Sequence, residues 1–474
     1  MLRSGQAIGR AAVSVSVTVF ALLVPELARA NGAFPAVSQL VPDPADADHL
    51  VLRTTFGLLV TRDRGATWDW LCEAGAGYLD VEPPMAVLPG GVILLGLPEG
   101  VSRSSASGCS FERAKGIDAI VYDLARVPSE PDGAVAISGS GTDAQLWRSV
   151  DAGKSFAPAG DVIADFLPTT VDVAATDSNA IYASGVSGTS GVLLRSSDGG
   201  QSFKRFVVPG ATATRRPFIA AVDPRDADTV YVRLDAPSAA PLEVTHDGGK
   251  SFVTPLTTTV PAAGFAISPD GSTVIVSNAY DGTFRAATDT LEFEKVACSG
   301  PTCLSFNEAG LFGCGDQFVH GFVVGRSDDL GASFQRLVDL TCVRGPAECD
   351  SETTVGSLCP AAWPDVQQQL GATECAPPQV AINTDCLGTG GSNEGAAGGS
   401  TAGADAGTNG GAGGRAGESG SASPPVAKTS DGCNCRLANA PSPENPWRLW
   451  AAAAALLRFR RRPTPARSAH RKQS

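Results

Sequence analysis

An eight-residue pattern that recurs along the chain constrains this sequence more than any other feature. It reads Ser/Thr-x-Asp-x-Gly-x-Ser/Thr-aromatic, and its five intact copies span 61–68, 149–156, 196–203, 245–252 and 327–334. Asp and Gly favour tight turns, because the Asp carboxylate accepts backbone N–H bonds and Gly tolerates positive φ. The aromatic residue that closes each copy brings a large apolar side chain that gains from burial. Each copy is therefore predicted to be a hairpin turn followed by a strand with a buried aromatic residue.

The copies recur at a nearly fixed interval. Their Asp residues are Asp63, Asp151, Asp198, Asp247 and Asp329, and their aromatic residues are Trp68, Phe156, Phe203, Phe252 and Phe334. Two decayed copies fill the wider gaps, 104–111 with Ala106 at the Asp position and 286–293 with Thr288 there. A period of 41 to 49 residues with strand-like segments is typical of a β-propeller, whose blades each hold four antiparallel strands. We therefore predict an all-β fold: a seven-bladed β-propeller of four-stranded antiparallel blades over residues 31–340.

Apolar runs between the turns predict individual strands of the blades. The predicted innermost strands are 37–41, 218–222 and 263–267, and the predicted second strands are 51–54, 229–232 and 272–276. The predicted third strands, which precede the repeated turns, are 57–60, 145–147, 191–194 and 321–324.

The repeated octapeptides resemble the Asp-box, or BNR, repeats of sialidases, sortilin-type receptors and photosystem II assembly factor-like propellers. The resemblance covers about residues 34–340. It implies that the boxes lie on the outer turn between the third and fourth strands of each blade, away from the central funnel where ligands bind. It therefore implies a structural role for the Asp and aromatic residues of the boxes, since a shared fold does not carry a shared function.

Both the N-terminus and the cysteine content indicate export. Residues 1–30 hold Arg3 and Arg10, an apolar run over 11–24 and a small-x-small site at 28–30, which is the order of a cleaved signal peptide. An uncleaved anchor is the alternative, although the run is shorter than the roughly 20 residues of a membrane span. The chain has 12 Cys and 2 Met. An even set of ten Cys before the tail predicts disulfides in an oxidising compartment.

Those ten disulfide candidates are Cys72, Cys109, Cys298, Cys303, Cys314, Cys342, Cys349, Cys359, Cys375 and Cys386. Spacing does not determine their pairing, and one option joins Cys72 to Cys109 between the first two blades. A metal site at Cys298, Cys303 and Cys314 is the alternative, but zinc sites favour more closely paired ligands. We expect no metal and no cofactor.

The part of the chain after the propeller divides into three segments. Residues 341–386 are predicted to form a Cys-rich cap with a short helix at 364–370, which has Pro at its first turn. Its Gly-Pro-x-x-Cys and Cys-Pro-x-x-Trp runs resemble those of secreted Asp-box proteins of myxobacteria. Residues 387–431 are rich in Gly, Ala and Ser and are predicted to be a disordered linker.

The tail, 432–474, combines a Cys motif (Cys433 and Cys435), a short apolar run at 449–457 and an Arg cluster at 458–462. This order resembles the MYXO-CTERM sorting signal, which implies attachment to the outer cell surface through the tail. A disordered tail with a Cys-x-Cys disulfide is the alternative.

The net charge argues against some classes of partner, and the available side chains argue against sialidase activity. The chain carries a net charge of −13, and the basic residues of both ends leave the exported body more acidic still. Such a surface repels nucleic acid and anionic membranes. A sialidase of the resembled family needs three Arg, a Tyr paired with Glu, and an Arg-Ile-Pro motif, whereas this chain has only Arg215-Arg216-Pro217, in blade five. Tyr122, Tyr182 and Tyr231 lie in strand-like runs where packing is the expected role.

We therefore expect a monomeric, non-catalytic binding or scaffold propeller that holds a glycan or protein ligand at the funnel. The expected binding loops join first to second strands and blades to each other, with candidates at 138–143, 185–191 and 236–240. Two alternatives stay open: a glycoside hydrolase of exo-sialidase type, and a purely structural envelope protein.

Overall fold

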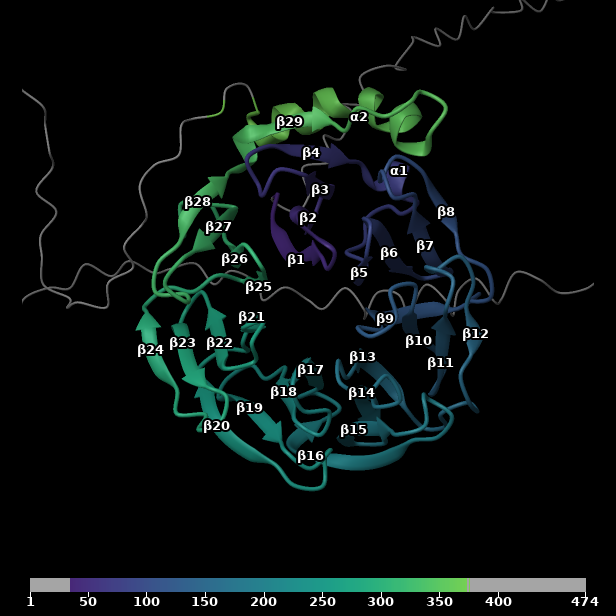
Figure 1. The fold of residues 1–474 in the computed structure, drawn as a ribbon, viewed down its shortest axis with the longest axis vertical. Helices are drawn as coiled ribbons and strands as arrows, with labels where there is room; N and C mark the ends of the chain where they lie inside the picture. Colours follow the sequence, from purple (N-terminus) through teal and green to yellow (C-terminus); the bar gives the residue numbers. More distant parts are fainter. Residues whose placement is uncertain (1–34, 373–374, 376–474) are drawn as a thin grey trace, which may run out of the picture. The chain divides into compact units, whose positions relative to one another are not determined.

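The protein forms a seven-bladed β-propeller in the computed structural model, which describes residues 35–372 and 375. Seven sheets follow one another around a ring (Figure 1). Each is built from four consecutive strands, and the sheet of blade one gains a fifth strand from the residues after blade seven. Every pairing within a blade is antiparallel. The predicted fold class is confirmed.

Each blade runs from an innermost strand at the ring centre to an outermost strand at the rim. The innermost strands are β1 (Val37–Asp43), β5 (Met85–Leu88), β9 (Ile120–Arg126), β13 (Leu167–Val173), β17 (Pro217–Val222), β21 (Gly264–Ile267) and β25 (Cys303–Asn307). The second strands are β2 (Asp46–Thr54), β6 (Val92–Leu97), β10 (Ala134–Ser140), β14 (Ile181–Ser187), β18 (Val230–Leu234), β22 (Thr273–Asn278) and β26 (Gly310–Cys314). The third strands are β3 (Gly57–Thr61), β7 (Gly100–Ser104), β11 (Asp143–Ser149), β15 (Ser190–Ser196), β19 (Ala240–Thr245), β23 (Gly282–Ala287) and β27 (Val324–Ser327). The outermost strands are β4 (Trp68–Leu71), β8 (Phe111–Arg113), β12 (Ala157–Pro158), β16 (Lys204–Thr212), β20 (Val253–Thr258), β24 (Glu294–Ala297) and β28 (Gln335–Val338).

The strands predicted from the sequence match these positions except in blade seven. Its third strand was predicted at 321–324, but β27 begins at Val324. The preceding residues form a long loop instead, in which the ring of His320 bonds to the backbone at both of its nitrogens. Both decayed repeats lie, as predicted, between third and fourth strands, in blades two and six.

All five intact boxes form the same hydrogen-bonded turn. In the box of blade four, Ser196 Oγ donates to Asp198 Oδ1 (2.7 Å), and Ser202 donates from its backbone N–H (3.0 Å) and its hydroxyl (2.5 Å) to the same carboxylate. Ser196 Oγ also accepts the N–H of Gly200 (2.8 Å). The other four boxes repeat these contacts. The carboxylate therefore holds the turn together from within.

Acid is expected to weaken these turns. The hydrogen bond from Ser202 lowers the pKa of Asp198 to about 2, below the roughly 3.9 of an unfolded Asp. Because the folded pKa is the lower one, the stabilisation is complete above about pH 4 and is lost as the pH falls toward 2. In urea unfolding, the difference in midpoint between the wild type and Asp198→Asn should shrink over that interval. A difference that stays constant from pH 4 to pH 2 would contradict this role.

The box glycines pack against the preceding blade. Gly153 adopts φ +76°, and a Cβ there would lie 2.4 Å from Leu94 Cδ2 on β6 of blade two. Gly200 packs in the same way, because a Cβ there would lie 2.3 Å from Leu146 Cδ2 of blade three. The box glycine is therefore required both by its backbone conformation and by the close approach of two blades.

We expect Gly153→Ala to lower the free energy of unfolding by roughly 2–4 kcal/mol, from about 1–2 kcal/mol of left-handed strain plus overpacking against Leu94. The matched control is Gly188→Ala, which has φ +57° and no atom within 4 Å of the added Cβ. Its free energy of unfolding should fall only by the cost of left-handed backbone strain, about 1–2 kcal/mol. Chemical unfolding of both variants measures the difference, and equal losses would show that blade contact contributes nothing.

The residues after blade seven close the ring. After the short helix η1 (Leu340–Cys342), strand β29 (Val343–Pro346) pairs in parallel with β4 at the outer edge of blade one. Helix α2 (Thr354–Leu370) follows and lies outside β4 and the short helix α1 (Glu73–Ala76), so that segments from opposite ends of the propeller lie side by side (Figure 1). We call residues 340–372 and 375 the C-terminal latch.

Disulfides fix the latch to two blades. Cys72 of blade one pairs with Cys359, and Cys109 of blade two pairs with Cys349. The option of a Cys72 to Cys109 pair was therefore wrong, because the latch lies against both blades and supplies each cysteine with a partner. The other described pairs are Cys303 with Cys314 and Cys342 with Cys375, and Cys298 is also disulfide-bonded.

The latch helix is longer than predicted. It begins at Thr354 rather than at residue 364, because the hydroxyl of Thr353 caps it by accepting the N–H of Gly356 (3.1 Å). Pro360 and Pro364 lie inside it. None of the helices within the described ranges combines the length with the apolar character that a membrane-spanning helix needs.

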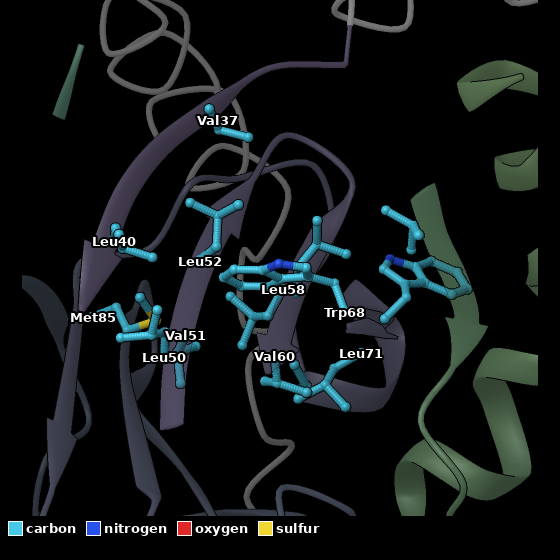
Figure 2. Close-up of a cluster of buried hydrophobic side chains, with 14 of the residues drawn as sticks. Val37, Leu40, Leu50, Val51, Leu52, Leu58, Val60, Trp68, Leu71 and Met85 are labelled. Carbon is cyan, nitrogen blue, oxygen red and sulfur yellow. The ribbon is translucent and has the colours of Figure 1, made fainter. Parts of the chain in front are cut away.

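The largest buried cluster joins blade one to the latch. Trp68, the aromatic residue of the first box, is fully buried and lies beside Leu52 and Leu58 (Figure 2). Trp70 is also buried, and its ring lies 5.6 Å from that of Trp363 in α2. The predicted signal peptide, Cys386, the predicted linker and the predicted sorting motif with Cys433 and Cys435 all lie outside the described residues.

Candidate binding site

The strand order gives the ring two distinct faces. Turns from first to second and from third to fourth strands share one face with the Asp boxes, which we call the box face. Turns from second to third strands share the other with the connections between blades, and we call it the crossover face. The candidate loops 138–143, 185–191 and 236–240 join second to third strands and so lie on the crossover face. These loops were expected to join first to second strands or neighbouring blades, which was wrong for all three. First-to-second turns lie on the box face, because successive antiparallel strands alternate in direction.

Side chains bridge the innermost strands of neighbouring blades. Asp123 on β9 accepts the N–H of Val171 on β13 (2.9 Å), and Asp172 on β13 accepts the N–H of Val222 on β17 (3.3 Å). Thr170 Oγ1 accepts the N–H of Ile219 on β17 in the same way (2.9 Å). An innermost strand has a free hydrogen-bonding edge, so these contacts satisfy groups that would otherwise lack partners.

The charged groups at the ring centre are poorly solvated. Burial raises the pKa of Asp123 to about 7, although N–H bonds from Val171 and Leu124 oppose the shift. Burial likewise raises the pKa of Asp172. It lowers the pKa of three guanidinium groups, those of Arg53, Arg126 and Arg233.

The three central arginines have different surroundings. Arg53 donates to Ser38 Oγ and to the carbonyl of Pro83, and Arg233 lies 4.6 Å from the ring centre of Phe218. Arg126 is the last residue of β9, so it lies next to the box face. Arg215 and Arg216 lie in the connection between blades four and five. Arg215 donates to Ala239 O in the β18–β19 turn, and Arg216 donates to Ala213 O in the same connection. These contacts do not bring three guanidinium groups to one point for a carboxylate.

The tyrosines considered from the sequence have packing roles or lie at the ring centre. Tyr182 and Tyr231 are fully buried, and the hydroxyl of Tyr182 donates to Ala227 O (2.8 Å). Tyr122 is part-exposed on β9. The sequence reasoning overlooked Tyr78, which lies near Glu73 and Arg53. Burial raises the pKa of Glu73 to about 7, but Tyr78 is itself buried in the core of blade one.

The alternative metal site was placed at three cysteines of blades six and seven. Cys298, Cys303 and Cys314 are all in disulfides and so are not thiolate ligands in this form. Within residues 35–372 and 375, no group of three or more His, Cys, Asp or Glu side chains is placed to hold a metal ion.

The ten Asp-box residues lie at the outer turns of blades one, three, four, five and seven, away from the ring centre. Their carboxylates are used within the turns, and their aromatic residues are buried or half-buried between strands. The structure does not bring them together into a site.

Two exposed aromatic side chains distinguish the crossover face. Tyr280, in the turn from β22 to β23, is 80% exposed, and Phe318, in the loop from β26 to β27, is 73% exposed. No other aromatic side chain in the described part of the chain is exposed. Val319 beside Phe318 is exposed as well (58%). Sequence reasoning missed both aromatics, although Tyr280 stands in a Tyr-Asp-Gly turn where packing does not require a ring.

Hydrogen bonds connect the two loops that carry these rings. Gly300, in the connection from blade six to blade seven, donates its N–H to Asn278 O (3.1 Å) and its carbonyl accepts from His320 Nε2 (2.9 Å). His320 Nδ1 accepts the N–H of Asp316 (3.0 Å), so the buried imidazole is neutral with its proton on Nε2. Asn278 also fixes its own turn by accepting the N–H of Tyr280 (2.9 Å). The aromatic pair is thus presented by two interconnected loops of adjacent blades.

Comparison with known proteins gives fold neighbours only. No protein-family model matches the chain, and no curated protein matches it. Among similar solved structures is an ancestral GH74 enzyme, with 16% identity and a TM-score of 0.45 over 57% of this chain and 39% of that one. A GH74 xyloglucanase from Xanthomonas campestris has 15% identity and a TM-score of 0.28 over 67% and 57% of the two chains. YCF48 bound to D1 peptide has 13% identity and a TM-score of 0.39 over 55% and 80%. This chain thus spans less than two thirds of each of the two GH74 proteins, and these values assign it neither an activity nor a ligand.

Proposed function

We propose that this protein is an exported, non-catalytic binding propeller, displayed at the cell surface through its C-terminal tail. Its ligand, a glycan or a protein, docks on the crossover face at Tyr280 and Phe318. One observation carries the proposal: the two exposed aromatic side chains of the described chain lie on connected loops of neighbouring blades. Exposed rings are unfavourable in water, whereas Tyr and Phe are enriched where proteins bind partners and stack on other surfaces.

The disulfides support export in this proposal. Four described pairs, one of them 287 residues apart in sequence, persist in an oxidising compartment and not in a reducing cytosol. The central carboxylates of Asp123 and Asp172 have a structural use in this proposal, because each accepts a backbone N–H from the neighbouring blade.

The test measures binding of the full-length oxidised protein to immobilised glycans and to outer-envelope proteins. It compares the wild type with a variant that lacks both aromatic rings. We expect the Tyr280→Ala/Phe318→Ala variant to bind its ligand roughly tenfold to a hundredfold more weakly, since central aromatic contacts contribute about 2 kcal/mol or more. The control is Val207→Ala/Val253→Ala, two exposed apolar side chains on outermost strands (64% and 52% exposed), which should bind as wild type. Equal weakening in both variants, or none in either, would contradict a site at the two rings.

A further inference from the structure

A second candidate site lies on the opposite side of the ring, at the box face. A cavity of about 240 Å³ opens where β9, β13 and β17 end, at the inner edges of blades three, four and five. Arg126 and Asp172 line it together with small apolar residues, among them Ala125, Ala175 and Val222. Its walls are thus small apolar groups with one guanidinium and one carboxylate.

The guanidinium of Arg126 is available to a ligand. Among the described residues it forms no hydrogen bond or ion pair, although other arginines of the propeller pair with carboxylates or carbonyls. It is half-buried, and burial lowers its pKa while Asp172 opposes that shift. A partly desolvated guanidinium without a partner is unfavourable, so an anion that enters the cavity gains a strong charge-assisted contact.

Asp172 supplies the complementary group. Its two oxygens accept the N–H groups of Val173 (2.8 Å) and Val222 (3.3 Å), which fixes the carboxylate at the cavity wall. It is not in ion-pair contact with Arg126, so the cavity presents a donor fork and a carboxylate as separate groups. Each carboxylate oxygen has a second lone pair with which to accept a further hydrogen bond.

We propose that this cavity binds a small organic acid group that carries a hydroxyl, amino or amide donor on the carbon next to its carboxylate. Arg126 holds the carboxylate in a bidentate contact, and Asp172 accepts from the neighbouring donor. The volume is below the roughly 300 Å³ at which drug-sized pockets begin, so the site takes a single unit and not an extended chain. That unit is either a free hydroxy or amino acid or the carboxyl end of a longer molecule.

The test is calorimetric titration of the full-length oxidised protein with L-lactate, L-alanine and N-acetyl-L-alanine, and with L-alaninamide, which lacks the carboxylate. We expect saturable binding of at least one acid in the millimolar range or tighter, and none of the amide. Preference for N-acetyl-L-alanine would identify the carboxyl end of a longer molecule as the natural ligand. Preference for L-lactate or L-alanine would identify a free acid. Absence of binding by all three acids, or equal binding of the amide, would overturn the proposal.

Variants locate the site. Arg126→Gln should weaken binding at least about tenfold, whereas Arg113→Gln, a change at an exposed arginine on β8, should leave it unchanged. Ala175→Phe, which fills the cavity and leaves both charged residues unsubstituted, provides a second variant if Arg126→Gln does not fold. Binding that survives in a folded Arg126→Gln or Ala175→Phe protein would place the ligand elsewhere. The Tyr280→Ala/Phe318→Ala variant should bind these acids as wild type, so failure of one site leaves the other testable.

Discussion

The variant Cys109→Ser/Cys349→Ser is expected to lose roughly 4 kcal/mol of unfolding free energy relative to the wild type. The disulfide joins residues 240 positions apart, but with Cys72–Cys359 intact the shortest closed loop runs through that bond and is much shorter. The entropy that such a cross-link removes from the unfolded chain grows with the length of this loop. It also holds the latch against blade two, where Val355 donates its N–H to Cys109 O and Phe111 donates its N–H to Thr354 Oγ1 (both 3.0 Å). Its removal therefore weakens the closure of the ring as well as the cross-link.

Equilibrium unfolding in guanidinium chloride measures this loss. The control is Cys303→Ser/Cys314→Ser, which removes a disulfide between positions only 11 apart within blade seven. By the same loop-length argument it should lose about 3 kcal/mol. If the short-range variant is destabilised as much as the long-range one, or more, the latch does not close the ring in the way described.

The variant Trp68→Ala should lose about 3–5 kcal/mol, the range for truncating a fully buried large aromatic side chain. Trp68 fills the centre of the cluster between blade one and the latch, and its Nε1 donates to Gly65 O (3.0 Å) inside its own box. The variant thus leaves a cavity and also removes a hydrogen bond from the turn.

The matched control for Trp68→Ala is Phe252→Ala, the corresponding position of the box in blade five, where the ring is only half-buried. Its loss should be clearly smaller. Thermal or chemical unfolding that gives the reverse order would show that the cluster of blade one is not the main support of this end of the ring.

The fold was predictable because its signal is local and repeated. A box such as 196–203 specifies its own turn through Ser196, Asp198 and Ser202, and seven turns at a nearly constant spacing define the blades. The latch was not predictable in the same way. Its strand β29 and its two disulfides to blades one and two join segments more than 200 residues apart, and the spacing of the cysteines does not indicate these pairings.

The candidate sites were harder to predict than the fold. The loops 138–143, 185–191 and 236–240 were chosen for their small residues, yet the exposed rings lie in turns of blades six and seven. The loop that carries Phe318 contains the two hydrogen bonds of His320, which the sequence does not reveal. Arg126 and Asp172 come together only because β9 and β13 end side by side.

The most direct test of a non-catalytic binding role is to recover the ligand after binding. Glycans that the full-length protein retains from an array, with sialosides among them, would be incubated with it for many hours and analysed by mass spectrometry. A binding propeller returns every bound glycan intact, and a protein ligand would leave the glycan array empty while an envelope protein is retained. Steady release of a shortened glycan, abolished by heat inactivation of the protein, would contradict the account and establish a glycoside hydrolase.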